Sequence, residues 1–221
     1  MSLRAQLQGA LPVTAPLVLN PLMARMVEAA GFEAIEIEDQ LVPKRAHHHV
    51  GIEHMIPVEL MAAKVREAVA ARRSPDFLII GRTNAMRASD MDDALRRGEA
   101  YRKAGADVLL LSMAHRPEQL RAIAARLGGP LMYLAGRGGL AGHGMTLEDL
   151  GALGYAIVAD PSTPLLAAYV AWKKVYADLA EDFGARQPKV DWSPVEHEML
   201  KVIDIEKLLA VERATVEKGK S

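Results

Sequence analysis

The sequence predicts an α/β protein in which helices cover a parallel β-sheet. Strand-like segments alternate with helix-like segments over most of the 221 residues, an order typical of repeated strand–helix units. The strand-like segments are short and apolar, which is typical of strands covered on both faces. Charged and polar residues stand where these apolar runs end: Glu38–Asp39, Arg82–Thr83, Ser112 and Asp160.

The first half of the chain supplies three predicted strands and three predicted helices. The strands are expected at 16–20, 34–39 and 77–80, and the helices at 21–30, 57–71 and 89–104. Gly31 is a stop signal after the first helix, Pro57 suits the first position of the second, and Ser89 is the expected N-cap of the third.

The second half continues the alternation. Strands are expected at 107–112, 131–135 and 155–160, and helices at 116–127, 146–153 and 163–183, with a helical tail after Pro194. The residues T-L-E-D at 146–149 form a capping-box pattern at the start of their helix.

Composition excludes several classes of protein. Half of the residues are hydrophobic, which is enough for a sizeable core, and the length suits one domain. The net charge of −1 argues against a nucleic-acid partner, and the absence of cysteine excludes disulfides and thiol chemistry. No apolar run reaches membrane-spanning length and no signal peptide is recognisable, so we expect a cytoplasmic protein without a membrane partner. The dinucleotide and P-loop motifs are also missing.

Polar residues at the strand ends suggest a (β/α)8 barrel, whose active site lies at the carboxyl ends of its strands. However, only six strands are predicted, and a complete barrel has eight strands and typically about 250 residues.

The stretch from Ala34 to His49 carries the most chemistry. In a strand, Ile35 and Ile37 point one way, while Glu36 and Glu38 point the other way, into the barrel. Carboxylates at a barrel mouth suit Mg²⁺ or general acid–base work. The alternative is an edge strand with its polar face in water.

Cations and histidines follow these carboxylates. Lys44 and Arg45 would complement an anionic substrate or stabilise an enolate, or else lie in a solvated loop. His47, His48 and His49 cannot all reach one metal ion from regular backbone, so a single histidine acting as acid, base or substrate contact is favoured over zinc.

Two further features could contact an anion. Arg82, after FLIIG, could hold a substrate carboxylate through two parallel hydrogen bonds, could pair with an acid such as Glu38, or could do both. The glycine-rich segment 136–144 could cradle an anion through backbone amides, although a flexible loop is the simpler interpretation.

Together these motifs resemble the isocitrate lyase/phosphoenolpyruvate mutase superfamily. The resemblance rests on IEDQ-x-x-PKR followed by His, and on FLIIGRTNA one helix later. It runs in order from about residue 4 to residue 178, with AGAD at 104–107 and PLMYLAGRGG at 130–139. It is most like bacterial members of the methylisocitrate lyase or oxaloacetate decarboxylase kind.

The resemblance implies a (β/α)8 barrel over residues 1–184 and a helical extension over 185–221 that packs on a neighbouring subunit in a dimer of dimers. It implies a lyase or decarboxylase that uses Mg²⁺, or Mn²⁺ in its place, and passes through an enolate-type intermediate of a small 2-oxo or 2-hydroxy carboxylate. Residue by residue, Glu38 corresponds to the carboxylate that reaches the metal through water. Lys44, Arg45 and His48 fall on the catalytic gating loop, and Arg82 and Asn84 fall at substrate-binding positions.

The sequence departs from the superfamily pattern at three places. Ala46 stands where the lyases have a catalytic Cys, which argues against cleavage by that route and leaves decarboxylation or another enolate reaction open. Asn84 stands where Asp is common, and the family's Asn-x-Thr-Glu is replaced by Leu134, Ala135, Gly136 and Arg137.

The third departure is the absence of two β/α units between Ala34 and Ile35, among them the strand that bears the primary metal ligands, which are not found in the sequence. We expect an omitted segment rather than a true deletion, because an apolar six-strand remnant should fold poorly. A gap between neighbouring Cα atoms at 31–36 would show the omission.

Three functions remain open from the sequence. The first is the carbon–carbon lyase or decarboxylase, and the second is a phosphonate P–C mutase or hydrolase. The third is a non-catalytic remnant that acts in assembly or binding.

Overall fold

The computed structural model describes residues 13–16, 34–41, 45–71, 75–136, 138–186 and 188–215. The predicted helix at 21–30, Lys44 and Arg137 therefore lie outside the described residues. The chain divides into two compact units, of which the first includes residues 31–164 and the second includes residues 165–221. The boundary expected at residue 184 stays a prediction.

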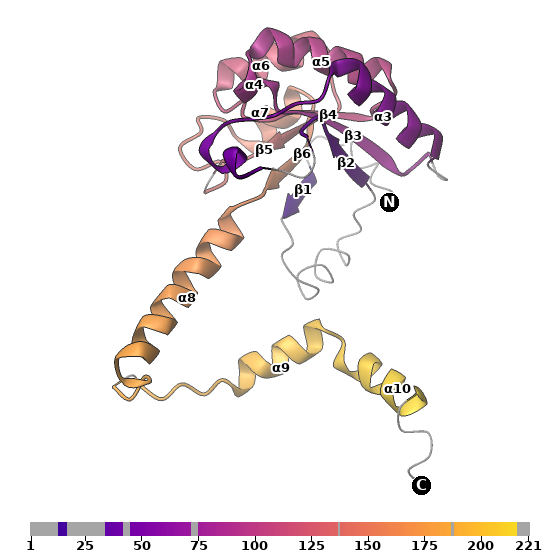
Figure 1. Ribbon diagram of the computed structural model, residues 1–221. Helices are drawn as coiled ribbons and strands as arrows, with labels where there is room; N and C mark the ends of the chain where they lie inside the picture. Colours follow the sequence, from indigo (N-terminus) through magenta and orange to yellow (C-terminus); the bar gives the residue numbers. More distant parts are fainter. Residues whose placement is uncertain are drawn as a thin grey trace. The chain divides into compact units, whose positions relative to one another are not determined.

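The first unit is built on a parallel sheet, and six strands lie in the described residues. Five of them overlap the predicted strands, whereas the first lies at Val13–Pro16 and residues 17–20 of the strand predicted at 16–20 lie outside the described residues. The six strands are β1 (Val13–Pro16), β2 (Ala34–Glu38), β3 (Leu78–Thr83), β4 (Val108–Leu111), β5 (Leu131–Leu134) and β6 (Tyr155–Asp160). Their order is β1-β6-β5-β4-β3-β2, so the first strand pairs with the last, as it does in a closed barrel. β1 and β2 are the edges of the sheet, and the two missing units would lie between them (Figure 1).

The described part of the junction at residues 31–36, which begins at Ala34, is continuous. β2 runs without a break from Ala34 and pairs in register with β3, with Ala34 opposite Leu78 and Ile35 opposite Ile79. Whether a segment was omitted from the sequence or truly deleted stays a prediction, because residues 31–33 lie outside the described residues.

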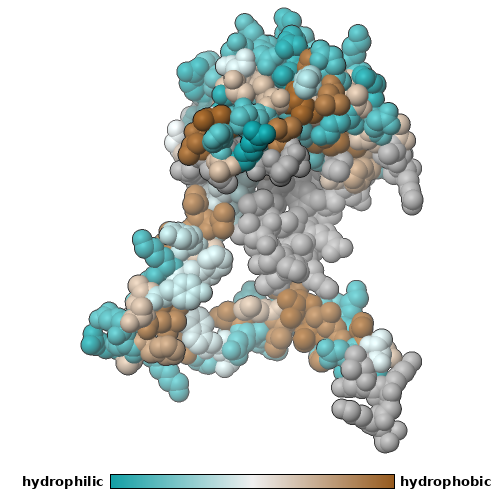
Figure 2. Space-filling view, viewed as in Figure 1, coloured by the Kyte–Doolittle hydropathy of each residue, from teal (hydrophilic) through white to brown (hydrophobic). Residues whose placement is uncertain are grey.

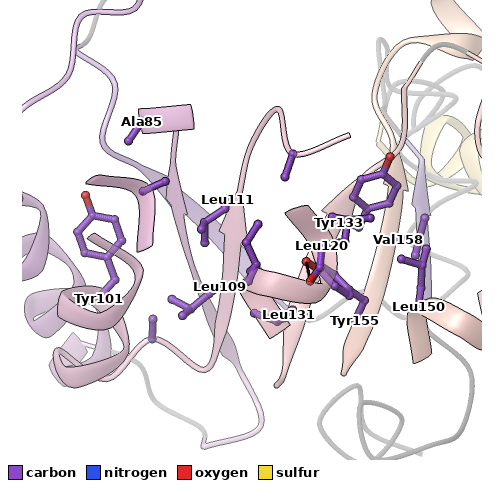
Figure 3. Close-up of a cluster of buried hydrophobic side chains, with 14 of the residues drawn as sticks. Ala85, Tyr101, Leu109, Leu111, Leu120, Leu131, Tyr133, Leu150, Tyr155 and Val158 are labelled. Atoms are coloured by element: carbon purple, nitrogen blue, oxygen red, sulfur yellow. Dashed lines mark hydrogen bonds between the residues drawn. The ribbon is translucent and has the colours of Figure 1, made fainter. Parts of the chain in front are cut away.

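Helices cover one face of this sheet (Figure 1). They are α3 (Val58–Ala71), α4 (Ala85–Ala88), α5 (Met91–Lys103), α6 (Pro117–Leu127) and α7 (Leu147–Ala152). The larger hydrophobic core fills the space between the sheet and these helices (Figure 3). Its largest fully buried members include Met61, Ile79, Tyr101, Leu109, Leu120, Leu131 and Leu150.

The opposite face of the sheet carries a second apolar cluster, formed by Leu78, Ile80, Val108, Leu110, Met132, Ile157 and Ala159. Ile37 packs against the helix-facing core, whereas Glu36 and Glu38 pair in register with Ile80 and Arg82 on the other face. The predicted alternation in β2 is thus confirmed for Ile37 and both glutamates. Among the described strands β2 is also an edge strand, and its Glu36 is exposed. The alternative interpretation, an edge strand with its polar face in water, therefore holds for Glu36.

Side-chain caps mark several helix starts. Thr146 and Asp149 form the predicted capping box of α7. The predicted N-cap Ser89 is wrong: it ends the short α4, and Asp90 caps α5 by accepting a hydrogen bond from the Asp93 backbone N–H at 2.8 Å. Four helical residues directly after a strand are too few to show a helical period.

Asp160 closes β6 and fixes the start of the next helix. Its Oδ1 accepts hydrogen bonds from the backbone N–H groups of Ser162 at 3.1 Å and Thr163 at 2.8 Å. Partial burial opposes ionisation of Asp160, but the hydrogen bonds from Thr163 and Ser162 outweigh it and lower its pKa below the usual 3.8.

We expect Asp160→Ala to lower the free energy of unfolding by about 1 kcal/mol at pH 7, since it removes a cap. A carboxyl with a lowered folded-state pKa stabilises the fold above its unfolded-state value, and this contribution is lost as the pH falls through the folded-state value. Urea unfolding of both proteins between pH 7 and pH 3 checks this. If the difference in the free energy of unfolding between the two proteins stayed constant below pH 3.8, the charge of Asp160 would not contribute to stability.

The second unit is described from Leu165 onward and is helical. Its helices are α8 (Thr163–Asp182), which begins two residues earlier, α9 (Ser193–Val202) and α10 (Ile205–Thr215). These helices contain no buried residue. Large apolar side chains are exposed along them (Figure 2), among them Tyr169, Trp172, Tyr176 and Met199, and Phe183 and Trp192 are exposed just outside the helix ends. Among the described residues, no helix has the length and apolar character to cross a membrane.

Candidate active site

The carboxyl ends of β2 and β3 bring an arginine between two glutamates. Arg82 Nη1 donates a hydrogen bond to Glu36 Oε1 at 2.8 Å, and its Nε lies 3.4 Å from Glu38 Oε2. The register that pairs Glu38 with Arg82 places these groups side by side on the face away from the helices. The predicted pairing of Arg82 with an acid is confirmed.

Asn84 completes this group. Its Oδ1 accepts hydrogen bonds from Arg82 Nε at 3.2 Å and Nη2 at 3.1 Å, while its Nδ2 donates to Glu38 Oε2 at 3.1 Å. Together these contacts use three of the five N–H bonds of the Arg82 guanidinium. One N–H on Nη1 and one on Nη2 remain for an anionic ligand.

A buried ionic cluster supports the group from the helix side. Asp39 is fully buried, and its Oδ1 accepts the backbone N–H of Asn84 at 3.1 Å. Its Oδ2 accepts hydrogen bonds from Tyr101 Oη at 2.8 Å and Arg97 Nη1 at 3.2 Å. Asp39 therefore connects α5 to the strand ends and holds the backbone of Asn84.

The environment of this cluster favours a neutral Tyr101 and a charged Arg97. Burial, and then the negative charge of Asp39, raise the pKa of Tyr101. Burial opposes the charge on Arg97, but hydrogen bonds with Tyr101 and Asp93 outweigh it and raise its pKa. Asp39, Arg97 and Tyr101 were not predicted as site residues. The sequence offered one sign of this cluster: strand alternation places the charge of Asp39 on the buried, helix-facing side, where a carboxylate needs partners.

A cavity of about 480 Å³ opens beside Arg82 and Asn84. Its lining includes Glu53, Arg87, Ser112, His115, Leu134 and Ser162. The Glu53 side chain is almost fully buried, accepts a hydrogen bond from Gln40 Nε2 at 2.6 Å and lies 3.5 Å from Arg87 Nε. The cavity thus holds two arginines, Arg82 and Arg87, each beside a carboxylate.

The remaining predicted site residues lie elsewhere or outside the description. Arg45 is exposed and does not line this cavity. His48 lies in the 3₁₀ helix η1 (Ala46–Val50), and its side chain is outside the description. His47 Nδ1 lies 3.3 Å from His54 Nε2, an exposed pair. The catalytic roles of Lys44, Arg45 and His48 stay predictions.

The described residues do not form a complete metal site. No group of three or more His, Asp or Glu side chains among them could hold a metal ion. Glu38, predicted to reach a metal through water, has Oε2 beside Asn84 and Arg82.

The amino-acid sequence matches a known family over most of its length. Residues 20–180 fit the model of the phosphoenolpyruvate phosphomutase family, which is more than half of the chain. The chain belongs to this family. The superfamily resemblance carried by IEDQ and FLIIGRTNA is thereby confirmed.

Members of the family with known activities are similar in sequence. The 2,3-dimethylmalate lyase of Eubacterium barkeri is 34% identical over 158 residues, which is 72% of this chain and 54% of that protein. The phosphonopyruvate hydrolase of a Variovorax species is 33% identical over 192 residues, 84% of this chain and 64% of that protein. An oxaloacetate decarboxylase of Rhodopseudomonas palustris is 37% identical over 99 residues, 45% of this chain and 34% of that protein. The chain spans between half and two thirds of the length of these first two relatives.

Solved structures of the family have the same fold. A crystal structure of 2,3-dimethylmalate lyase superposes with a TM-score of 0.75 at 20% identity, covering 96% of each chain. A phosphonopyruvate hydrolase complex with oxalate and Mg²⁺ superposes with a TM-score of 0.59 at 27% identity, covering 98% of this chain and 80% of that one. The predicted fold class, a phosphoenolpyruvate mutase-type barrel that lacks two units, is confirmed.

Proposed function

We propose that the chain is a lyase or decarboxylase that breaks a carbon–carbon bond in a small 2-oxo or 2-hydroxy carboxylate. The observation that carries this proposal is Arg82, which lines the cavity with two N–H bonds left for a substrate carboxylate. The similar lyases and decarboxylases act on small carboxylates, which supports the same substrate class here.

In this proposal Arg82 binds the carboxylate of the substrate. Glu36, Glu38 and Asn84 hold its guanidinium in place, so the carboxylate meets a preorganised cation rather than a mobile one. Loss of CO₂ or of a carbonyl fragment from such a substrate leaves an enolate, and nearby cations stabilise its negative charge. Arg87 lines the same cavity, and Lys44, Arg45 and His48 are proposed to approach on the preceding loop.

We propose Mg²⁺, or Mn²⁺ in its place, as cofactor, by similarity to the hydrolase complex with oxalate and Mg²⁺. When bound, such an ion would stabilise the oxygen atoms of a 2-oxo acid. Glu38 could contribute only through water. A phosphonopyruvate-directed activity is the second candidate, because the phosphonopyruvate hydrolase covers more of this chain than the lyase does.

We also propose a homo-oligomer, a dimer of dimers, in which α8–α10 cover a neighbouring subunit. The exposed apolar residues of these helices support it, because such side chains normally lie at an interface. A monomer in light scattering would count against it. The predicted cytoplasmic location stays a prediction.

An assay with a panel of acids tests the proposed reaction. The purified chain with Mg²⁺ is incubated with oxaloacetate, malate-like 2-hydroxy acids and phosphonopyruvate. Release of CO₂ or a 2-oxo acid from a carboxylate supports the proposal, and phosphate release from phosphonopyruvate supports the second candidate. No turnover of any acid would contradict both and favour a non-catalytic binding protein.

A further inference from the structure

A second cavity, of about 310 Å³, adjoins the first on the other side of His115 and Gly136, which line both. It is lined by His115, Arg116, Pro117, Tyr133, Gly136, Gly139, Ala141, Gly142 and His143. Nothing in the proposed reaction uses it. It lies where the end of β5 meets the start of α6 and the glycine-rich segment 136–144.

Two residues that line this cavity carry buried polar atoms without a hydrogen-bond partner. The Tyr133 hydroxyl, on a side chain that is only 3% exposed, has no hydrogen-bond partner. Both ring nitrogens of His143 are likewise buried and unpaired, and the two rings lie 5.4 Å apart. In Figure 3 the Tyr133 hydroxyl points away from the apolar cluster. Buried polar groups are almost always paired, so three such atoms at one place call for a partner that is either water or a ligand.

The neighbouring Tyr155 has the hydrogen-bond partner that is usual for a buried tyrosine hydroxyl. Tyr155 packs edge-on against Tyr133 with ring centroids 6.2 Å apart, and its hydroxyl donates to the Leu120 carbonyl oxygen at 3.2 Å. The core therefore offers a partner to one tyrosine and not to the other. The difference lies in the cavity that Tyr133 faces.

The lining of this cavity favours an anion over a cation, because the part of it that the structure describes offers hydrogen-bond donors and no carboxylate. None of the described lining residues is acidic, and three of them are His115, His143 and Arg116. Burial, and then the charge of His143, lower the pKa of His115 and so disfavour its charged form. Glu118 is not part of the lining and pairs with Arg116 at 3.0 Å, with both side chains exposed.

The backbone amides of the glycine-rich segment contribute less than its sequence suggested. Gly138 N–H donates to Thr163 Oγ1, and the N–H groups of Gly139, Ala141 and His143 bond within the segment. Recognition therefore falls to the side chains. We propose that this cavity is a binding site for a small oxyanion, a phosphate or a carboxylate, which Tyr133 and His143 hold by hydrogen bonds.

Imidazole NMR tests the site directly, because the chain has seven histidines and substitution assigns the signals of His115 and His143. Sodium phosphate and sodium acetate are titrated separately at constant ionic strength. We expect saturable shifts of both signals with a millimolar Kd. The anion that binds with the lower Kd shows whether the site prefers a phosphate or a carboxylate. Shifts that remain linear with both anions would overturn the proposal.

Two matched variants locate the anion. Tyr133→Phe should weaken binding about tenfold, since it removes one hydrogen bond to a charged group, and it should not lower the Tm of the anion-free protein because the hydroxyl has no partner. Tyr155→Phe should lower the Tm and leave binding unchanged. Equal affinity of wild type and Tyr133→Phe would overturn the proposal.

A third variant separates this site from the proposed active site. Arg82→Met should leave the shifts of His115 and His143 intact, because Arg82 does not line this cavity. Loss of those shifts in Arg82→Met would place the anion at the first cavity and overturn the inference. The proposed lyase activity plays no part in this readout, so either proposal can fail alone.

Discussion

Replacing Asp39 with alanine is expected to lower the free energy of unfolding by about 3–5 kcal/mol, the usual effect of breaking a buried ion pair from one side. The substitution leaves Arg97 charged in a buried position and removes the acceptor of the Tyr101 hydroxyl and of the Asn84 N–H. Urea denaturation followed by circular dichroism measures the change.

Asp93→Ala is the matched control for this variant. Asp93 also pairs with Arg97, at 2.9 Å, but its side chain is partly exposed. We expect a loss of about 1 kcal/mol, the range of exposed pairs and helix-start charges. Equal losses for the two variants would contradict the assignment of Asp39 as the centre of the cluster.

Replacing Arg82 with methionine is expected to lower kcat/KM for the active carboxylate by about 10²–10³-fold, comparable to losing an essential charge contact in other enzymes. The cause is loss of the cation that binds the substrate carboxylate, with Glu36 and Glu38 left without their common partner. Steady-state kinetics across the substrate panel measures it.

Two controls sharpen the test of Arg82. Arg82→Lys keeps the charge but not the paired N–H bonds, so an intermediate loss that appears mainly in KM is expected. Arg126→Met removes an exposed arginine whose partner is the exposed Glu99, and it should leave kcat/KM unchanged. Activity of Arg82→Met within threefold of the wild type would remove Arg82 from the site.

Local sequence patterns correctly predicted the features that depend only on neighbouring residues, such as strand alternation and helix starts. The period of two in Ile35–Glu38 predicted that Ile37 faces the helices, and T-L-E-D at 146–149 predicted the start of α7. The motif order also led to the six-stranded open barrel, because each missing β/α unit removes one strand from a known order.

Long-range partners were beyond such patterns. Asp39 meets Arg97 and Tyr101, which lie 58 and 62 positions further along the chain. The residues around Asp39 give no sign of which side chains it will contact. The sequence of the helix that carries Arg97 and Tyr101 predicts which of its faces is buried, but not which residue that face will meet. The same limit applies to Tyr133 and His143, whose shared cavity arises only when the glycine-rich segment returns over β5.

The central claim is that the cavity beside Arg82 binds a small carboxylate. Isothermal titration calorimetry of oxalate into the purified chain with Mg²⁺ present tests it most directly, with Arg82→Met titrated in parallel. We expect saturable binding of oxalate to the wild type and at least tenfold weaker binding to Arg82→Met, the change expected for losing a charged hydrogen bond. No heat beyond dilution for the wild type, or equal affinity for both proteins, would contradict it.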